Sequence, residues 1–226
     1  SDLDNDGDDD YIIGNLGLNN KFKAAKEHPF KVYANDFDNN GTNDIVLAKF
    51  YKDDYVPLRG RECTSQQMPY VSEKFKDYHS FASSKLIDIL PEDKVAEGVA
   101  YEITNFESAI LINEGGQLDR KALPIQSQVT PIKSSIVMDF NNDGNIDILT
   151  VGNHYGVEVE TTRYDSGIGN VLLGDGNNNF TDLTPIESGL YIPFDSRDVK
   201  IIKQRNRSLL IITNNNDAVS FYSFNN

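Results

Sequence analysis

Short runs of β-branched and aliphatic residues recur along the chain, separated by polar turns rich in Asp, Asn and Gly. Apolar runs of this length, bounded by such turn residues, are typical of strands that are buried in a sheet. The pattern therefore predicts an all-β fold for most of the sequence. The expected strands are residues 11–14, 30–34, 45–51, 99–105, 109–113, 135–138, 148–152, 157–163, 168–173, 198–203, 208–213 and 218–224.

Residues 52–97 have a different pattern, which predicts a small helical insert between strands. Residues 71–78 and 80–90 carry apolar side chains at helical spacing, with Ser80 as the N-cap of the second helix and Pro91 at its end. Acidic residues follow Pro91 and predict a third helix, because proline and acidic side chains suit a first turn. We expect the apolar faces of these helices to pack on a sheet.

A nine-residue acidic motif, D-x-[DN]-x-[DN]-G-x-x-D, occurs three times, at residues 2–10, 36–44 and 139–147, and a predicted strand follows each copy. Calcium takes about 6–8 oxygen ligands, and a loop that curls round the ion offers every second side chain. The glycine at the sixth position lets the backbone turn sharply, so that the seventh residue can offer its carbonyl oxygen. The predicted ligands are Asp2, Asp4, Asp6, Asp8, Asp10, Asp36, Asp38, Asn40, Thr42, Asp44, Asp139, Asn141, Asp143, Asn145 and Asp147.

Besides a structural calcium site, each of these loops could be an EF-hand, a metal-free turn or the site of a catalytic ion. An EF-hand needs a bidentate glutamate at position 12 and flanking helices, but that position holds Ile13, Leu47 or Thr150. A metal-free turn is the simpler alternative, although carboxylates at both ends of such a turn would repel one another. A catalytic ion needs open coordination positions in a cleft, and no nucleophile or base is evident nearby. The sequence therefore predicts two or three structural Ca²⁺ ions.

With a strand on either side, this motif resembles the FG-GAP or VCBS repeat of integrin-type β-propellers. Residues 170–180, NVLLGDGNNNF, resemble the strand and turn that close such a repeat, and residues 110–116 are a looser copy. Residues 58–69, LRGRECTSQQMP, are similar to an insert in large VCBS-repeat surface proteins of Bacteroidetes-type bacteria. The resemblance covers most of the chain outside residues 52–97.

The resemblance implies antiparallel four-stranded β-propeller blades, forming an arc or part of a seven-bladed propeller, with a small α-helical insert. The implied blade units are about residues 1–28, 29–113 with the insert at 52–97, 114–183 and 184–226. A small ring closed by the N-terminal strand is the alternative. The last unit has no metal motif, and Asn206 and Arg207 predict a plain turn there. The chain opens at a metal loop with no strand before it, which predicts a piece of a longer protein.

The formal charge of −14 argues against non-specific binding to nucleic acid or anionic lipid, which needs clustered Lys and Arg. Much of this charge lies in the metal loops. Cys63 is the only cysteine, so no intrachain disulfide forms. The chain has no apolar run near 18 residues and no signal peptide. Extracellular calcium modules bind at about 10⁻⁴–10⁻³ M, which favours an extracellular, cell-surface or periplasmic bacterial protein.

Candidate ligand-binding residues lie in the insert and in one loop. Arginine, planar amides and tyrosine together suit a carboxylate or a sugar. The alternative is that the arginines pair with nearby acids, such as Asp53, Asp54 or Glu62, and anchor the insert. The histidines have no zinc-site spacing, but one of them follows a metal strand at a predicted loop tip. The ligand-binding candidates are Arg59, Arg61, Gln66, Gln67, Tyr70 and His154.

Two functions fit these observations. The first is a calcium-binding adhesion module that binds a protein or a glycan. The second is part of a polysaccharide hydrolase or lyase, with its site in the insert or in missing blades. Ser65 lacks a G-x-S-x-G context and Cys63 has no identifiable partner histidine, so no catalytic residue is assigned. The sequence favours the binding module over an enzyme.

Overall fold

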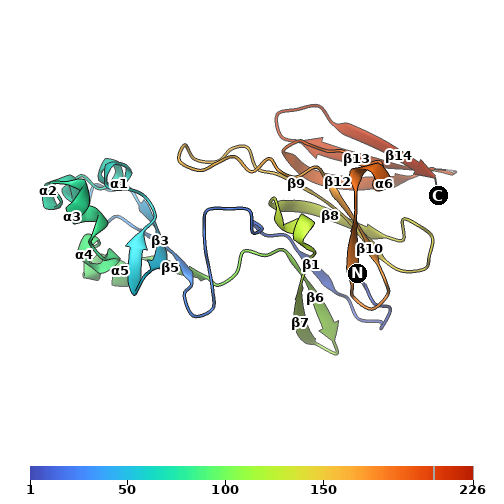
Figure 1. The fold of residues 1–226 in the computed structure, drawn as a ribbon, viewed down its shortest axis with the longest axis horizontal. Coiled ribbons are helices and arrows are strands. Elements are labelled where there is room, and N and C mark those ends of the chain that lie inside the picture. The colour runs from blue at the N-terminus through green and yellow to red at the C-terminus, as the bar shows by residue number, and fades with distance from the viewer. Residues whose placement is uncertain (206, 226) are drawn as a thin grey trace. The chain divides into compact units, whose positions relative to one another are not determined.

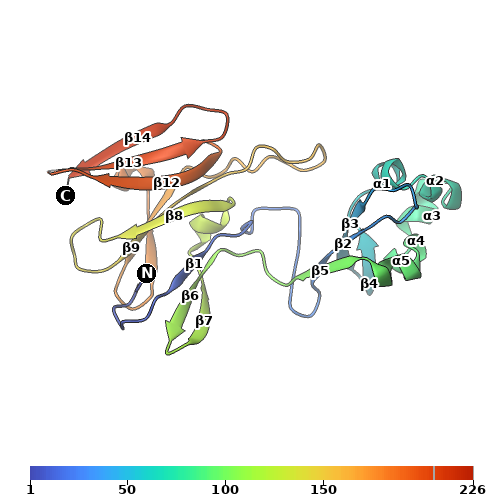
Figure 2. The same cartoon turned by 180° about the vertical axis from the view of Figure 1, so that it is seen from behind.

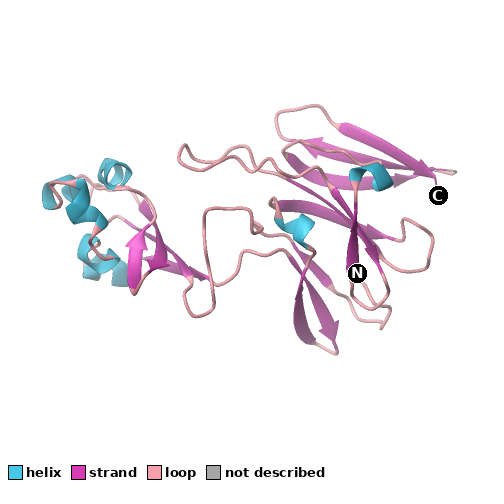
Figure 3. Cartoon of the chain, viewed as in Figure 1, coloured by secondary structure: helices cyan, strands magenta, loops and turns pink. Residues whose placement is uncertain are grey.

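The computed structural model describes residues 1–205 and 207–225, and most of its regular structure is strand (Figure 1, Figure 3). These residues form four small antiparallel sheets of three or four strands, together with a few short helices. The strands are β1 (Tyr11–Ile13), β2 (Phe30–Asn35), β3 (Asp44–Tyr51), β4 (Asp54–Pro57), β5 (Val99–Ile103), β6 (Ala109–Glu114), β7 (Gln117–Ala122), β8 (Ile132–Met138), β9 (Asp147–Gly152), β10 (Asn170–Gly174), β11 (Phe180–Leu183), β12 (Ser196–Lys203), β13 (Arg207–Asn214) and β14 (Ser220–Asn225). The helices are α1 (Arg61–Gln67), α2 (Tyr70–Lys74), α3 (Tyr78–Ala82), α4 (Leu86–Ile89), α5 (Glu92–Glu97), α6 (Pro185–Ser188) and the 3₁₀ helix η1 (Ile125–Gln128).

The four sheets confirm the predicted predominance of antiparallel β-structure. No propeller is detected among the described residues, so a ring or arc of blades stays a prediction. Arg207, expected in a turn, is the first residue of β13, and its predicted turn partner Asn206 lies outside the described residues. Within the described part of the chain, no helix has the length and apolar composition needed to cross a membrane.

The chain divides into two compact units. Unit 1 consists of Ser1–Lys21 and Glu107–Asn226, and unit 2 consists of Phe22–Phe106. Unit 2 therefore interrupts the sequence of unit 1 between β1 and β6, which still pair with each other in antiparallel register. The sequence pattern grouped β6 with the strands of unit 2, because periodicity identifies a strand but not its partner.

Unit 1 contains three of the sheets. One has the order β11-β10-β9-β8, the second β12-β13-β14 and the third β1-β6-β7. The strands β8 and β12 lie side by side (Figure 2), and Ser134 Oγ of β8 donates to Asp198 Oδ1 of β12 over 2.7 Å. Aliphatic side chains form two buried clusters in this unit. One joins the β8–β11 sheet to β12 and β13 and contains Ile212, and the other joins it to β6 and contains Ile148 and Leu172.

Unit 2 is one sheet, with the order β4-β3-β2-β5, and the helices α1 to α5 (Figure 1). Val46 and Ala48 of β3 pack with apolar side chains of these helices, including Met68, Val71 and Phe81, in a single cluster. The helices therefore bury their apolar faces on the sheet, as the sequence predicts.

Several elements differ from the prediction. The helix expected at residues 80–90 is two helices, α3 and α4, and Ser80 is not its N-cap: Asp77 is the cap, and its Oδ1 accepts from Ser80 N at 2.8 Å. The strand predicted at residues 157–163 is absent from the described structure, which has only a bridge between His154 and Tyr164 there. Strands β4, β7 and β11 and helices α1, α6 and η1 were not predicted.

A substitution at a buried position of unit 1 tests the packing of its core. Ile148 is 0% exposed and Ile186 is 95% exposed, so the same substitution has different consequences at the two sites. We expect Ile148→Ala to lower the free energy of unfolding by about 2–5 kcal/mol, and Ile186→Ala to change it by no more than about 0.5 kcal/mol. Urea unfolding followed by circular dichroism measures both, and similar losses in the two variants would contradict this core.

Candidate metal sites

The three acidic motifs fold into loops with the same backbone conformation: loop 1 (residues 2–10), loop 2 (36–44) and loop 3 (139–147). The fourth residue of each is an asparagine in the left-handed region, with φ of 62° in loop 1, 58° in loop 2 and 59° in loop 3. The sixth residue is a glycine with φ between 87° and 99°. Asparagine and glycine tolerate positive φ better than other residues. The asparagine was present in all three copies of the motif, and sequence reasoning missed this signal.

Five hydrogen bonds recur in every loop. In loop 2, the carboxylate of Asp36 accepts from Asn40 N and Gly41 N, each at 2.9 Å. Asp38 Oδ1 also accepts from Asn40 N, at 3.1 Å, and Asn40 Oδ1 accepts from Thr42 N at 2.8 Å. Asp44 Oδ2 accepts from the second residue of the loop, Phe37 N, at 3.1 Å. Loops 1 and 3 repeat all five bonds at the corresponding positions.

The ninth residue of each loop is a buried aspartate, and in loops 1 and 3 it joins the loop to a neighbouring strand. Asp147 is 0% exposed. Its Oδ2 accepts from Phe140 N at 2.8 Å, and its Oδ1 accepts from Gly174 N of β10 at 2.9 Å. Asp10 does the same in loop 1, where Oδ1 accepts from Asn113 N of β6 at 2.9 Å. One carboxylate thus fastens a loop to the neighbouring strand.

Loop 2 has a different neighbour. The amide of Ile45, just after Asp44, donates to Gln67 Oε1 of α1 at 3.1 Å. Lys94 Nζ of α5 donates to Asn39 Oδ1 at 2.5 Å. Helices therefore hold loop 2 in unit 2, whereas strands and hairpin turns surround loops 1 and 3 in unit 1.

Two of the loops bring three carboxylates together. Oxygen atoms of Asp2, Asp4 and Asp10 lie within 4.8 Å of one another, and so do those of Asp36, Asp38 and Asp44. In each triad two residues are partly exposed and the ninth is buried. Oxygen ligands at this spacing suit a hard divalent cation, so both triads could hold a metal ion. Loop 3 has Asn141 at the third position, so only two of these three residues are acids.

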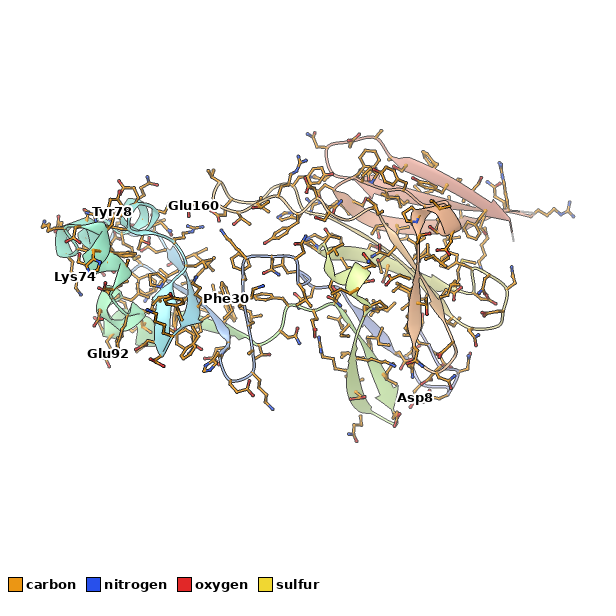
Figure 4. The ribbon with its side chains drawn as sticks, in the orientation of Figure 1. Asp8, Phe30, Lys74, Tyr78, Glu92 and Glu160 are labelled. Atoms are coloured by element: carbon orange, nitrogen blue, oxygen red, sulfur yellow. The ribbon has the colours of Figure 1, made fainter. Side chains whose placement is uncertain are left out.

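The remaining predicted ligands lie in the loops but outside the two triads. Asp6, Asn40 and Asp143, at the fifth position, each accept from the backbone N–H of the seventh residue at 2.8 Å. Asp8, at the seventh position of loop 1, accepts from Gly115 N of the β6–β7 turn at 2.8 Å (Figure 4). That side chain therefore ties the loop to a neighbouring hairpin. The other two seventh residues are Thr42 and Asn145.

The pKa values of the first and last aspartates of loop 2 are shifted in opposite directions. Burial raises the pKa of Asp44, and the negative charges of Asp38 and Asp36 raise it further. Donation by Gly41 N lowers the pKa of Asp36. A raised folded-state pKa means that ionised Asp44 weakens the ion-free fold at neutral pH, and that this cost disappears as the pH falls through the folded-state value. A bound cation would offset the same cost without protonation.

The six predicted ligand-binding residues do not form one site. Gln67 and Tyr70 have structural partners: Tyr70 OH donates to Ile89 O at 3.1 Å, and burial raises the pKa of Tyr70 to about 12. Gln66 is exposed on α1. Arg59 and Arg61 line a cavity in unit 2.

His154, the last of these six residues, belongs to unit 1. Its backbone forms the bridge to Tyr164. Burial lowers the pKa of this histidine, and the positive charges of Lys133 and Arg197 lower it further. Both effects favour the neutral imidazole, although the charge of Asp195 opposes them. That this side chain touches a ligand stays a prediction.

The chain was compared with protein-family models, curated proteins and solved structures, and none of the three comparisons gave a match. The candidate sites are therefore interpreted from their own geometry.

The left-handed glycine of loop 2 gives a direct test of the loop conformation. A methyl group at Gly41 would meet no atom within 4 Å, but φ is +87°. We expect Gly41→Ala to lower the free energy of unfolding by about 1–2 kcal/mol through backbone strain alone. Gly60→Ala is the control, because Gly60 has equal space and a φ of −69°. Equal stability of the two variants in urea unfolding would rule out the left-handed turn.

Proposed function

We propose that the chain is a calcium-binding module of an exported or cell-surface bacterial protein, which binds a protein or a glycan, and that its ions are structural. The observation that carries this proposal is the set of five hydrogen bonds repeated in all three loops. In each loop these bonds hold the side chains of the first, third and ninth residues, and in loops 1 and 2 the carboxylate oxygens of these three residues lie within 4.8 Å of one another.

A structural role follows from where the ligands come from. All three carboxylates of a triad belong to one loop of nine residues. A cation there removes the repulsion between them and holds together the strand ends that the loop connects. An ion that binds only the folded chain stabilises it by mass action, by about 2.7 kcal/mol per site when free calcium is a hundredfold above the dissociation constant.

We also propose that these sheets are blades of an FG-GAP or VCBS-type β-propeller. In the sheet of β8 to β11, neighbouring strands follow chain order, and loop 3 joins the first two strands. The sheet of β12 to β14 has the same order, and its first strand lies beside β8. When blades are arranged round an axis, the first strand of one blade lies beside the first strand of the next, as β12 does beside β8. These contacts support the proposal, and a crystal structure of the chain grown with calcium would test it.

Calcium should raise the thermal stability of the chain. We expect the melting temperature to increase with millimolar CaCl₂ and to return to its original value on addition of EGTA, because the ions bind only the folded loops. Magnesium should have a smaller effect, since it demands octahedral geometry at shorter distances. Differential scanning calorimetry measures both. An unchanged melting temperature after chelation of calcium-saturated protein would defeat the structural role.

Removal of one triad carboxylate should remove one ion. Asp38 belongs to the triad of loop 2, whereas Asp53 lies exposed in the turn between β3 and β4. We expect Asp38→Ala to lower the number of calcium ions bound per chain by one, and Asp53→Ala to leave it unchanged. Equilibrium dialysis with metal analysis counts the ions. The same stoichiometry in both variants would contradict binding in loop 2.

A further inference from the structure

Unit 2 contains a cavity of about 340 Å³ between the end of β3, the strand β4 and helix α3. Sites for small ligands usually have volumes of about 300–1,000 Å³, so this cavity has room for a sugar unit. Phe81 forms part of its wall and is 5% exposed, which makes that wall a fixed part of the core. We call this space the β4–α3 cavity.

Two tyrosines of the β4–α3 cavity are open to solvent. Tyr51 is 55% exposed and Tyr78 is 65% exposed, and Figure 4 shows Tyr78 among the helices of unit 2. A tyrosine ring has an apolar face and a polar hydroxyl group, which suits it to ligands that also have an apolar side and a polar side. The pyranose ring of a sugar is such a ligand, since its C–H groups gather on one face and its hydroxyl groups lie at the edge.

The charge of the β4–α3 cavity is opposite to that of the chain. Its lining includes Lys49, Arg59 and Arg61, and the described residues that line it include no carboxylate, although the chain has a net charge of −14. Glu62 of α1 and Asp54 of β4, two acids in elements that flank the cavity, have partners. Glu62 Oε2 accepts from Tyr78 OH at 3.0 Å, and Asp54 pairs with Lys85 at 2.6 Å.

The cations of this cavity have different roles. Arg61 Nε donates to Phe75 O at 2.7 Å, and its side chain is 15% exposed, so it holds the start of α1 against the end of α2. Lys49 Nζ lies 5.8 Å from the centre of the Tyr51 ring. Lys49 and Tyr51 therefore place a positive charge next to an exposed ring, whereas Arg61 Nη1 lies 3.6 Å from Glu62 Oε2, which offsets its charge.

We propose that the β4–α3 cavity binds an acidic sugar, a hexuronate unit of a polysaccharide, with its ring against Tyr51 and its carboxylate near Lys49. The inference rests on the proposed glycan-binding function and names the class of glycan. A charge-assisted contact to Lys49 selects the carboxylate, and the tyrosine faces select a sugar ring over a simple anion.

The test compares two sugars that differ only in charge. Isothermal titration calorimetry in buffer with calcium and low salt measures binding of a glucuronate-containing tetrasaccharide and of the same tetrasaccharide with its carboxyl groups reduced to alcohols. We expect the acidic sugar to bind about tenfold more tightly, with an affinity that falls as NaCl is raised. Equal binding of the two sugars would overturn the inference, and so would equally tight binding of inorganic sulfate.

Matched variants locate the site. Tyr51→Ser and Lys49→Gln should each weaken binding of the acidic tetrasaccharide about tenfold. Tyr101→Ser and Lys76→Gln are the controls, because both side chains are exposed in unit 2 and neither lines the β4–α3 cavity. Comparable losses in the controls would place the binding elsewhere and overturn the inference.

The melting temperature separates this inference from the proposed function. Each variant should keep the full calcium-dependent increase, because none of them alters a metal loop. If the wild-type chain shows that increase but binds neither tetrasaccharide, the acidic-sugar inference fails and the calcium-binding module stands. If the sugar binds and calcium has no effect on melting, the calcium proposal fails instead.

Discussion

A buried carboxylate that accepts hydrogen bonds from both a loop and its neighbour is the interaction on which this structure depends. Asp147 accepts from the loop at Phe140 N and from strand β10 at Gly174 N, and Asp10 repeats this in loop 1. A buried charge is expensive unless it is paired or hydrogen-bonded. The loop must therefore keep its conformation if the aspartate is to keep its hydrogen bonds. The aspartate must in turn stay in place if the strands are to keep their register. In loop 1, a cation bound to the carboxylate triad that includes Asp10 would strengthen both requirements together.

The same motif works in two different surroundings. In unit 1 the strand after each loop pairs with a further strand, whose backbone N–H reaches the ninth aspartate. In unit 2, β4 pairs with β3 only from Ala48 onward, so β4 does not reach Asp44. Gln67 of α1 accepts from the adjacent amide of Ile45 instead. The helices thus complete the polar contacts beside loop 2 and also cover the apolar face of the sheet.

The sequence predicted those features for which a position accepts few residue types. It did not predict which strands pair with each other. The aspartates and glycines of the motif identified all three loops, since few other residues fit a turn with positive φ and converging oxygens. The pairing of β1 with β6 could not be predicted, because unit 2 separates the two strands along the chain. Strand β7 is exposed along its whole length and so carries no alternating apolar pattern. Gln67 and Tyr70 have side chains suited to a ligand, but their partners are internal. Only the fold decides between those two uses.

Loop 2 and the wall of the β4–α3 cavity contribute side chains to the same buried cluster. An ion in loop 2 could therefore affect binding of a ligand that it does not contact. Phe37, the second residue of loop 2, is 3% exposed and packs in the cluster that contains Phe81, a wall of the cavity. The amide of Phe37 donates to Asp44, which is a member of the carboxylate triad. Protein interiors are packed densely enough to transmit such constraints. An ion that fixed Asp44 would therefore also fix Phe37 and, through the cluster, the cavity wall at which we propose that the ligand binds. In that proposal calcium would contribute by positioning the wall, and the ligand would need no direct bond to the metal.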